Sequence, residues 1–270
     1  MIKLIASDLD GTLLDPAGNL PEATFSAIEK LYKNGTLFCA ASGRQLAGLR
    51  QLFAPVADKI LLIAENGAIV AHADNIFACS SIPRENITRA LSAIKTLRRA
   101  HPLLCTPDRA YYEEAAQPFL QFVQASYVSN AQAKLAEIAA NETVCKIAVY
   151  DESGPENDGM LVLPAALPDM RVIQSGGNWL DISERDANKG NAMRMIQEHL
   201  HLSPEECMAF GDHMNDYELL LACGHPYVTD NAYPGLKQRF SSVVASNADE
   251  GVLQAMLSVA EGKLPEKLDR

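Results

Sequence analysis

Near its start the chain reads Lys3-Leu4-Ile5-Ala6-Ser7-Asp8-Leu9-Asp10-Gly11-Thr12, a mainly apolar run that passes directly into two acids and a glycine. The run from 3 to 7 predicts a buried strand. Side chains two residues apart on an extended segment point to the same side, so Asp8 and Asp10 are expected to face one crevice. Open parallel sheets bind ligands at the carboxyl ends of their strands. The alternative is a strand followed by an Asp-rich turn without chemistry.

Apolar runs that alternate with helical patterns extend this arrangement along the chain. Short apolar runs at 37–41, 60–64 and 207–210 predict further strands, and helical patterns lie at 21–34 and 189–202. Continuous apolar strands separated by helices are typical of a parallel sheet that is covered on both faces. We therefore predict an α/β fold with a Rossmann-like parallel-sheet core.

The middle of the chain has a different rhythm. A helix is expected through Ile87, Leu91 and Ile94, followed by hairpin-like pieces at 107–112, a helix near 131–139 and a strand at 146–150. Mixed helices and antiparallel-looking strands predict an inserted α+β domain. The expected division is a core of residues 1–82 and 183–270, with a cap domain at 83–182.

A second acidic element, Gly211-Asp212-His213-Met214-Asn215-Asp216, follows the predicted strand at 207–210. If its acids meet Asp8 and Asp10, their like charges require a cation. Oxygen ligands with open coordination positions favour Mg²⁺. The alternative is a polar turn in which Asn215 or Asp216 caps the next helix, and capping is compatible with ligation.

Two further residues have side chains suited to phosphate. Ser42 ends the strand predicted at 37–41, where its hydroxyl and nearby backbone amides would meet phosphate oxygens, although it would also serve as a helix cap. Lys189 opens a predicted helix and would stabilise charge on a transferring phosphoryl group. Alone, such a lysine is usually a solvated surface residue.

Composition narrows the range of partners. A formal net charge of −11 without a basic cluster leaves no surplus of Lys and Arg for nucleic acid or an anionic membrane surface. Nowhere do about 18 uncharged apolar residues run together, so no membrane span is expected. The six cysteines occur singly, as is typical of buried thiols in a reducing compartment. A cytoplasmic protein is expected, without nucleic-acid or membrane partners.

The four elements, in this order, resemble the haloacid dehalogenase-like (HAD) superfamily of phosphotransferases. Residues 8–12 match its first motif, Ser42 its second, Lys189 its third and residues 211–216 its fourth. The long insert resembles the type IIB (C2) cap, and Asn66-Gly67 is similar to the Cof-type sugar phosphatase branch. The likeness spans essentially the whole chain. It departs from the family at 229–232, Thr-Asp-Asn-Ala, where Met-Gly-Asn-Ala is commoner.

The resemblance implies a role for each matching residue. Asp8 is expected to attack phosphorus, and Asp10 to protonate the leaving alcohol and then activate water. The implied Mg²⁺ ligands are Asp8, the backbone carbonyl of Asp10, Asp212 and Asp216, the last either directly or through water. Phosphoryl oxygens are expected to contact Gly11, Ser42, Lys189 and Asn215.

The predicted function is Mg²⁺-dependent hydrolysis of small phosphate monoesters such as sugar phosphates, through an aspartyl phosphate. Two alternatives remain open. A phosphomutase on the same scaffold would return the phosphate to a sugar and form an isomer. A non-catalytic sensor of phosphorylated metabolites would have no need of Asp8 and Asp10, which are both present.

Overall fold

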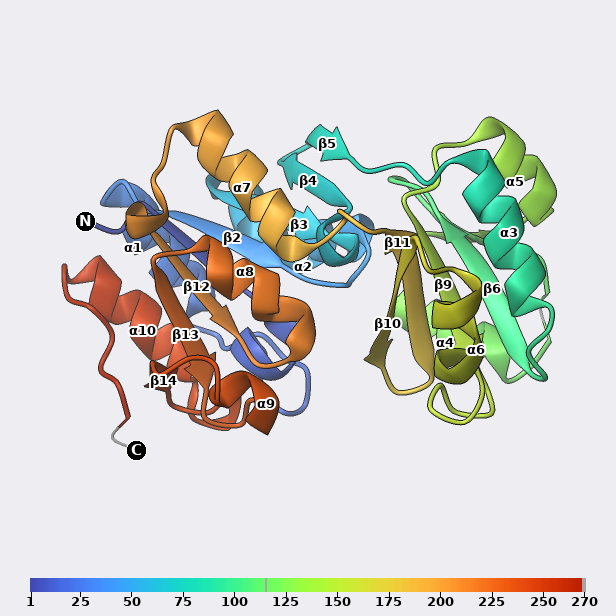
Figure 1. The fold of residues 1–270 in the computed structure, drawn as a ribbon. Coiled ribbons are helices and arrows are strands. Elements are labelled where there is room, and N and C mark those ends of the chain that lie inside the picture. Colours follow the sequence, from blue (N-terminus) through green and yellow to red (C-terminus); the bar gives the residue numbers. More distant parts are fainter. Residues whose placement is uncertain (115, 269–270) are drawn as a thin grey trace. The chain divides into compact units, whose positions relative to one another are not determined.

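The chain divides into two compact units in a computed structural model that describes residues 1–114 and 116–268. Unit 1 contains residues 1–42, 52–77 and 188–270, and unit 2 contains residues 43–51 and 78–187. Figure 1 shows the elements of both units along the chain. Within the described residues, no helix is long and apolar enough to cross a membrane.

Unit 1 is built on an eight-stranded sheet in the order β14-β13-β12-β1-β2-β3-β4-β5. The strands from β14 to β3 pair in parallel, whereas β3 and β4 pair antiparallel. The predicted parallel-sheet core is therefore confirmed, with an antiparallel addition at one edge. The strands are β1 (Leu4–Ser7), β2 (Leu37–Ala41), β3 (Ile60–Ala64), β4 (Ile69–His72), β5 (Asn75–Cys79), β12 (Cys207–Gly211), β13 (His225–Thr229) and β14 (Val243–Val244).

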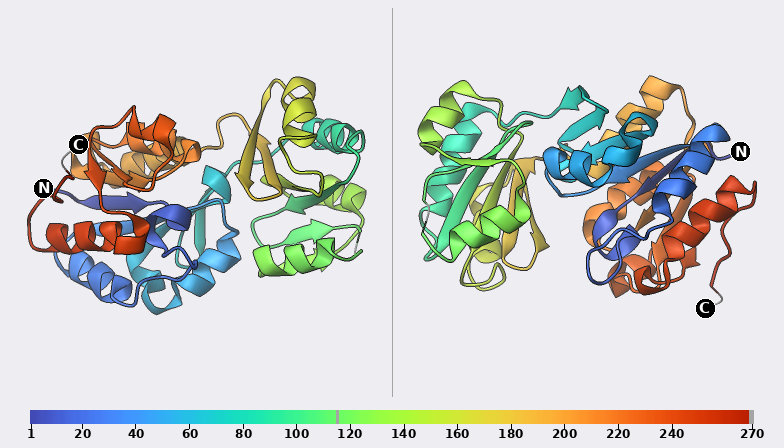
Figure 2. Two further views of the ribbon diagram at one scale, coloured as in Figure 1. Left: turned by 90° about the horizontal axis from the view of Figure 1, so that it is seen from below. Right: turned by 180° about the vertical axis from the view of Figure 1, so that it is seen from behind.

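Helices cover both faces of this sheet, which explains why its central strands are apolar throughout. In the left view of Figure 2, α1 and α10 lie on one face and α7 and α8 on the other. Every residue of β1, β3 and β12 is buried. The helices are α1 (Thr24–Lys33), α7 (Lys189–Leu200), α8 (Tyr217–Ala222), α9 (Pro234–Lys237) and α10 (Gly251–Ala260).

Unit 2 is a six-stranded sheet in the order β10-β11-β9-β6-β7-β8, antiparallel except for the β7–β8 pair. Apolar side chains of α3, α5 and α6 pack with those of the strands in one core. The α+β character that we predicted for the middle of the chain is present. The strands are β6 (Ala100–Cys105), β7 (Ala110–Tyr112), β8 (Asn130–Gln132), β9 (Lys146–Asp151), β10 (Met170–Gly176) and β11 (Trp179–Glu184); the helices are α2 (Leu46–Leu52), α3 (Arg84–Ile94), α4 (Phe119–Ser126), α5 (Leu135–Asn141) and α6 (Gly159–Ala166).

The prediction of a helix near 131–139 was correct for the second part of that segment and wrong for the first. Strand β8 occupies the first part of that segment, and α5 begins only at Leu135. The β8 backbone pairs with β7, and Gln132 donates its side-chain amide to the Glu113 carbonyl at 3.0 Å. Tertiary pairing thus overrides the helical propensity of the alanines in this segment.

Candidate active site

Three of the four predicted acidic residues, Asp8, Asp212 and Asp216, meet at one edge of the unit 1 sheet, because the strands that precede their loops are adjacent and in register. Ser7 of β1 is level with Phe210 of β12 and Ala40 of β2. Asp8 directly follows β1, and its N–H donates to the Phe210 carbonyl at 3.0 Å. Asp212 directly follows β12. The carboxyl ends of these strands therefore bring together residues that are distant in the sequence. The Thr12 hydroxyl, for example, donates to Asp212 Oδ1, 200 positions further along the chain.

Three carboxylates form a compact group at this edge. Asp8, Asp212 and Asp216 each offer one oxygen atom, and these oxygens all lie within 4.8 Å of one another. Asp8 is only 5% exposed and Asp216 is fully buried. Water screens such charges poorly, so a cation must offset their repulsion.

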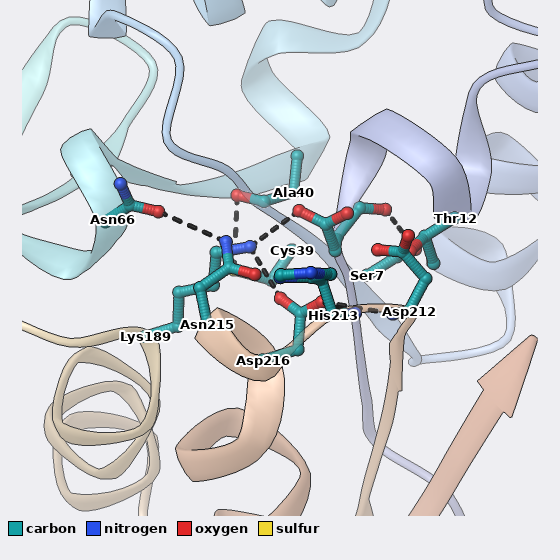
Figure 3. Close-up of polar contacts among 11 residues, drawn as sticks. Ser7, Thr12, Cys39, Ala40, Asn66, Lys189, Asp212, His213, Asn215 and Asp216 are labelled. Carbon is teal, nitrogen blue, oxygen red and sulfur yellow. Dashed lines mark hydrogen bonds and ion pairs between the residues drawn. The ribbon is translucent and has the colours of Figure 1, made fainter. Parts of the chain in front are cut away.

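Lys189 supplies one such positive charge. Its Nζ donates to Asp8 Oδ1 at 2.6 Å and to Asp216 Oδ1 at 2.6 Å, and its side chain is fully buried. Figure 3 shows Lys189 reaching Asp216 from the start of α7. The helix begins here because the Asn188 side chain accepts from the Asn191 N–H at 2.9 Å as an N-cap. The alternative of a solvated surface lysine is thereby excluded for Lys189.

Both oxygens of the Asp216 carboxylate bind groups of the protein itself. Oδ1 accepts from Lys189, and Oδ2 accepts from the N–H groups of Asp212 at 3.1 Å and His213 at 3.2 Å. Asp216 therefore holds the 212–216 loop closed and Lys189 in place. The alternative role considered for Asp216, a side-chain cap on α8, is not observed, because its carboxylate makes no capping hydrogen bond to that helix.

Electrostatics of the site favour a bound cation. Burial, together with the negative charge of Asp216, raises the pKa of Asp8 well above its usual value, while Lys189 opposes this rise. The same two causes raise the pKa of Asp212 to about 6. Burial lowers the pKa of Lys189, but Asp216 and Asp8 more than compensate and hold it above its usual value.

The donor set fits Mg²⁺, since the group offers only oxygen atoms and the raised pKa values of Asp8 and Asp212 mean that these two carboxylates resist ionisation without additional positive charge. Lys189 already engages Asp8 Oδ1 and Asp216 Oδ1. Asp212 accepts from the Thr12 hydroxyl at 3.2 Å through Oδ1. Asp8, Asp212 and Asp216 are the side chains that would hold the ion, and a contribution from the Asp10 carbonyl remains a prediction.

The segment after Asp8 forms a wide turn over Leu9–Leu13, closed by the Leu14 N–H, which donates to the Leu9 carbonyl at 2.9 Å. Gly11 has φ +82° in this turn, and a Cβ atom there would overlap the Asp212 carboxylate. Only glycine combines this backbone conformation with so close an approach. The side chain of Asp10 is exposed on the same turn.

Ser42 and Asn215 are linked to the site through Asn66. Ser42 is buried, its N–H donates to the Ile63 carbonyl at 2.8 Å, and its own carbonyl accepts from the Asn66 N–H at 3.0 Å. Asn215 donates its side-chain amide to Asn66 Oδ1 at 3.4 Å, as Figure 3 shows. Whether Ser42 and Asn215 contact phosphate remains a prediction.

The sequence analysis gave Thr12 no role of its own, although Thr12 lies within the motif at 8–12. The contact between Asn66 and Asn215 was not predicted. Gly67 explains the position of this turn, because a Cβ atom there would overlap the backbone of Asn188. The turn after β3 therefore packs directly on the start of α7. The Asn66-Gly67 pair was the available signal, since these residues often adopt left-handed backbone conformations.

Comparison with known proteins reveals similarity along nearly the whole chain. A family model described as haloacid dehalogenase-like hydrolase matches residues 5–256. An HMP-PP phosphatase of Yersinia enterocolitica is 29% identical over 262 residues, which cover 93% of each chain. A 5-amino-6-(5-phospho-D-ribitylamino)uracil phosphatase of Escherichia coli is 26% identical over 273 residues, which cover 98% of each chain.

Solved structures share the fold. A crystal structure of a Thermotoga maritima protein superposes with a TM-score of 0.83 at 27% identity and covers 100% of both chains. A Streptococcus mutans protein superposes with a TM-score of 0.86 at 21% identity, covering 97% of this chain and 100% of that one. The second likeness concerns the fold alone.

Proposed function

Because the chain belongs to the haloacid dehalogenase-like hydrolase family and is a phosphatase, we propose that it hydrolyses small phosphate monoesters through a covalent phosphate on Asp8. The resemblance inferred from the four motifs is confirmed by the family match over residues 5–256. One observation supports the assignment of the nucleophile above all others. Asp8 directly follows β1, and its carboxylate contacts buried Lys189 and lies beside Asp212 and Asp216.

In the first step, a carboxylate oxygen of Asp8 attacks phosphorus, and the bond between phosphorus and the ester oxygen breaks. Asp10, on the exposed side of the following turn, donates a proton to the departing alcohol. Lys189 favours the ionised form of Asp8 and opposes the rise in its pKa, because the ammonium lies 2.6 Å from Oδ1. The product of this step is an acyl phosphate on Asp8 and a free alcohol.

In the second step, the Asp10 carboxylate accepts a proton from water while the water oxygen attacks phosphorus. The bond between phosphorus and Asp8 breaks, inorganic phosphate leaves, and both aspartates return to their starting states. Lys189, Ser42, Asn215 and the Gly11 amide are proposed to bind the phosphoryl oxygens during both steps. Bound Mg²⁺ would supply charge neutralisation between the carboxylates and the phosphate.

The substrate is proposed to be a small phosphorylated metabolite, of which sugar phosphates are one class. The two named relatives act on compounds of this size, HMP-PP and 5-amino-6-(5-phospho-D-ribitylamino)uracil. Unit 2 is proposed to act as the cap domain that distinguishes leaving groups. A mutase reaction would instead yield an isomeric phosphate without net release of inorganic phosphate.

The proposed function is tested by measuring phosphate release from a panel of sugar phosphates, nucleotides and phosphorylated cofactors, with Mg²⁺ or with a chelator. Wild type is compared with Asp8→Asn, which keeps the shape of the side chain but removes the nucleophile. Release that requires Mg²⁺ and is absent in the folded variant is expected. A folded Asp8→Asn protein with wild-type turnover would refute the assigned nucleophile.

The covalent step has its own measurement. Wild type is mixed with a substrate that carries radiolabelled phosphate, quenched in acid during turnover and separated from free label. Label that stays with the protein and is released by hydroxylamine, as for an acyl phosphate, is expected for wild type and not for Asp8→Asn. Formation of an isomeric phosphate in place of inorganic phosphate would identify a mutase.

A further inference from the structure

Two exposed aromatic rings of unit 1 contact each other beside the acidic group. The ring centroids of His213 and Tyr233 are 5.4 Å apart, and the ring planes are tilted by 52°. Tyr233 is 50% exposed, and His213 is exposed as well. Aromatic rings contribute much of the energy of cores and interfaces, so a pair that stays exposed beside a reaction centre is a candidate surface for a ligand.

Backbone hydrogen bonds fix both rings to the acidic group. His213 directly follows Asp212, and its N–H donates to Asp216 Oδ2 at 3.2 Å. The Tyr233 N–H donates to the Asp212 carbonyl at 2.8 Å. In the view of Figure 3, the His213 ring lies between the carboxylates of Asp212 and Asp216. The two rings therefore form part of the rim of the carboxylate group.

The loop that carries Tyr233 also contacts the turn after the nucleophile. Asn231, two residues before Tyr233, donates its side-chain amide to the Gly11 carbonyl at 2.8 Å. Asp10, the proposed general acid, immediately precedes Gly11. The segment at 231–233 therefore joins the turn at which the leaving alcohol would be protonated to the loop that bears Asp212.

We propose that His213 and Tyr233 are specificity-determining residues whose rings contact a planar aromatic leaving group of the phosphate ester. A flat ring can extend the pair at the centroid spacing of about 4.5–7 Å that aromatic rings prefer. A puckered ring of similar size covers a similar apolar area but has no π face to offer. The inference rests on the proposed function, in which the alcohol leaves beside Asp10.

The test uses two esters that differ in the ring of the leaving group alone. Benzyl phosphate carries a planar ring, and cyclohexylmethyl phosphate carries a puckered ring with the same number of carbon atoms. Both esters have the same charge and release a primary alcohol. The quantity to measure is kcat/KM for benzyl phosphate divided by kcat/KM for cyclohexylmethyl phosphate. Damage to the metal site, the general acid or the phosphoryl contacts affects both esters and cancels in this ratio.

Wild type is compared with Tyr233→Leu, His213→Leu and Tyr233→Phe. In each leucine variant the ratio should fall about two- to tenfold, the range for an aromatic contact beyond the area that it buries. Tyr233→Phe keeps the ring and should therefore keep the ratio of wild type. A wild-type ratio in either leucine variant would overturn the proposal, and so would an equal fall in Tyr233→Phe and Tyr233→Leu.

Tyr32 is the matched control. It is 46% exposed, close to the value for Tyr233, and it also belongs to unit 1. It lies on α1, which carries none of the residues assigned to the site. Tyr32→Leu should leave the ratio of the two kcat/KM values unchanged. A fall in Tyr32→Leu equal to that in Tyr233→Leu would show that the position beside the acidic group has no part in the effect, which would overturn the proposal.

A binding measurement separates failure of this inference from failure of the proposed function. Phenethylphosphonate and cyclohexylethylphosphonate replace the ester oxygen of the two substrates by a methylene group, so they bind without turnover. Calorimetry with Mg²⁺ should show that the preference of wild type for the phenyl compound falls about two- to tenfold in Tyr233→Leu. An unchanged preference would refute the ring contact even if both esters release phosphate. The expected fall in a protein that releases no phosphate would refute the proposed function alone.

Discussion

Lys189 and Asp216 form an ion pair at 2.6 Å in which both side chains are fully buried. Such a pair is costly to break, because the remaining charge stays out of water. Asp216→Asn keeps the shape of the side chain and removes its charge. We expect a loss of about 3 kcal/mol in the free energy of unfolding, the lower end of the range for breaking a buried pair, since Asp8 still contacts Lys189.

Chemical denaturation measures this loss, and Glu261→Gln is its control. Glu261 pairs with Lys263 at 3.0 Å, but both side chains are more than half exposed. Exposed pairs contribute little, so this variant should lie within about 0.5 kcal/mol of wild type. Equal losses in the two variants would contradict a structural role for the buried pair.

Lys189→Met tests the charge of the lysine separately from its bulk. Methionine fills much of the same buried space but leaves Asp8 and Asp216 without their common cation. We expect kcat to fall by about 10²–10³-fold, the range for removing one charge-stabilising group from an active site. Lys3→Met, which breaks the partly exposed pair with Glu206, should keep wild-type kcat. Comparable kcat values for the two variants would rule out the assigned role.

Gly11 and Gly18 form a matched pair for separating backbone strain from crowding of the site. Both have φ +82°, but a Cβ at Gly11 would overlap Asp212, whereas one at Gly18 has nothing within 4 Å. Both alanine variants should lose about 1–2 kcal/mol of stability from the left-handed backbone alone. Only Gly11→Ala should also lose activity and Mg²⁺ affinity, because it must displace Asp212.

Thermal unfolding, phosphate release and Mg²⁺ titration of the two variants provide the measurements. Wild-type Mg²⁺ affinity in Gly11→Ala would show that the turn tolerates a side chain beside Asp212. Loss of activity in Gly18→Ala would show that strain in this part of the chain is itself sufficient to disrupt catalysis.

Local sequence patterns were sufficient to predict β1, β2, β3 and β12 of the sheet and the acids that follow two of these strands, but not β4, β5 and β13. The buried strands β1 and β12 are continuous apolar runs, and acids follow each of them directly. Parallel pairing then brings Asp8 and Asp212 together without any further information. Lys189 was a candidate from its residue type and its place at a helix start, but its burial could not be predicted, because that depends on how α7 packs.

Contacts between distant side chains had no local signal. The bond from Asn231 to Gly11 joins residues 220 positions apart, and neither residue type predicts a partner. In unit 2, α6, which begins at Gly159, was not predicted. A Cβ at Gly159 would overlap the Leu180 side chain, so that helix is specified by tertiary packing.

Mg²⁺ should stabilise the protein more at neutral pH than in mild acid. Burial and Asp216 raise the pKa of Asp212 from 3.8 to about 6, so the metal-free folded state binds this proton more tightly than the unfolded state does. The contribution of this proton binding by Asp212 to the stability of the metal-free protein is therefore greatest at low pH, and it is lost as the pH rises through about 6. Mg²⁺ must compete with the proton below that pH and faces ionised carboxylates above it. The rise in Tm on adding Mg²⁺ should be small at about pH 5 and larger at about pH 7.5.

Thermal unfolding with and without Mg²⁺ at the two pH values checks this expectation, at ionic strength matched with NaCl. Asp212→Asn is the control, because its amide neither titrates nor offers a carboxylate to the ion. In Asp212→Asn the rise in Tm caused by Mg²⁺ at neutral pH should be much smaller than in wild type. The difference between the rises at the two pH values should also be smaller. Equal rises at both pH values in wild type would mean that protonation of the acidic group is not linked to Mg²⁺ binding.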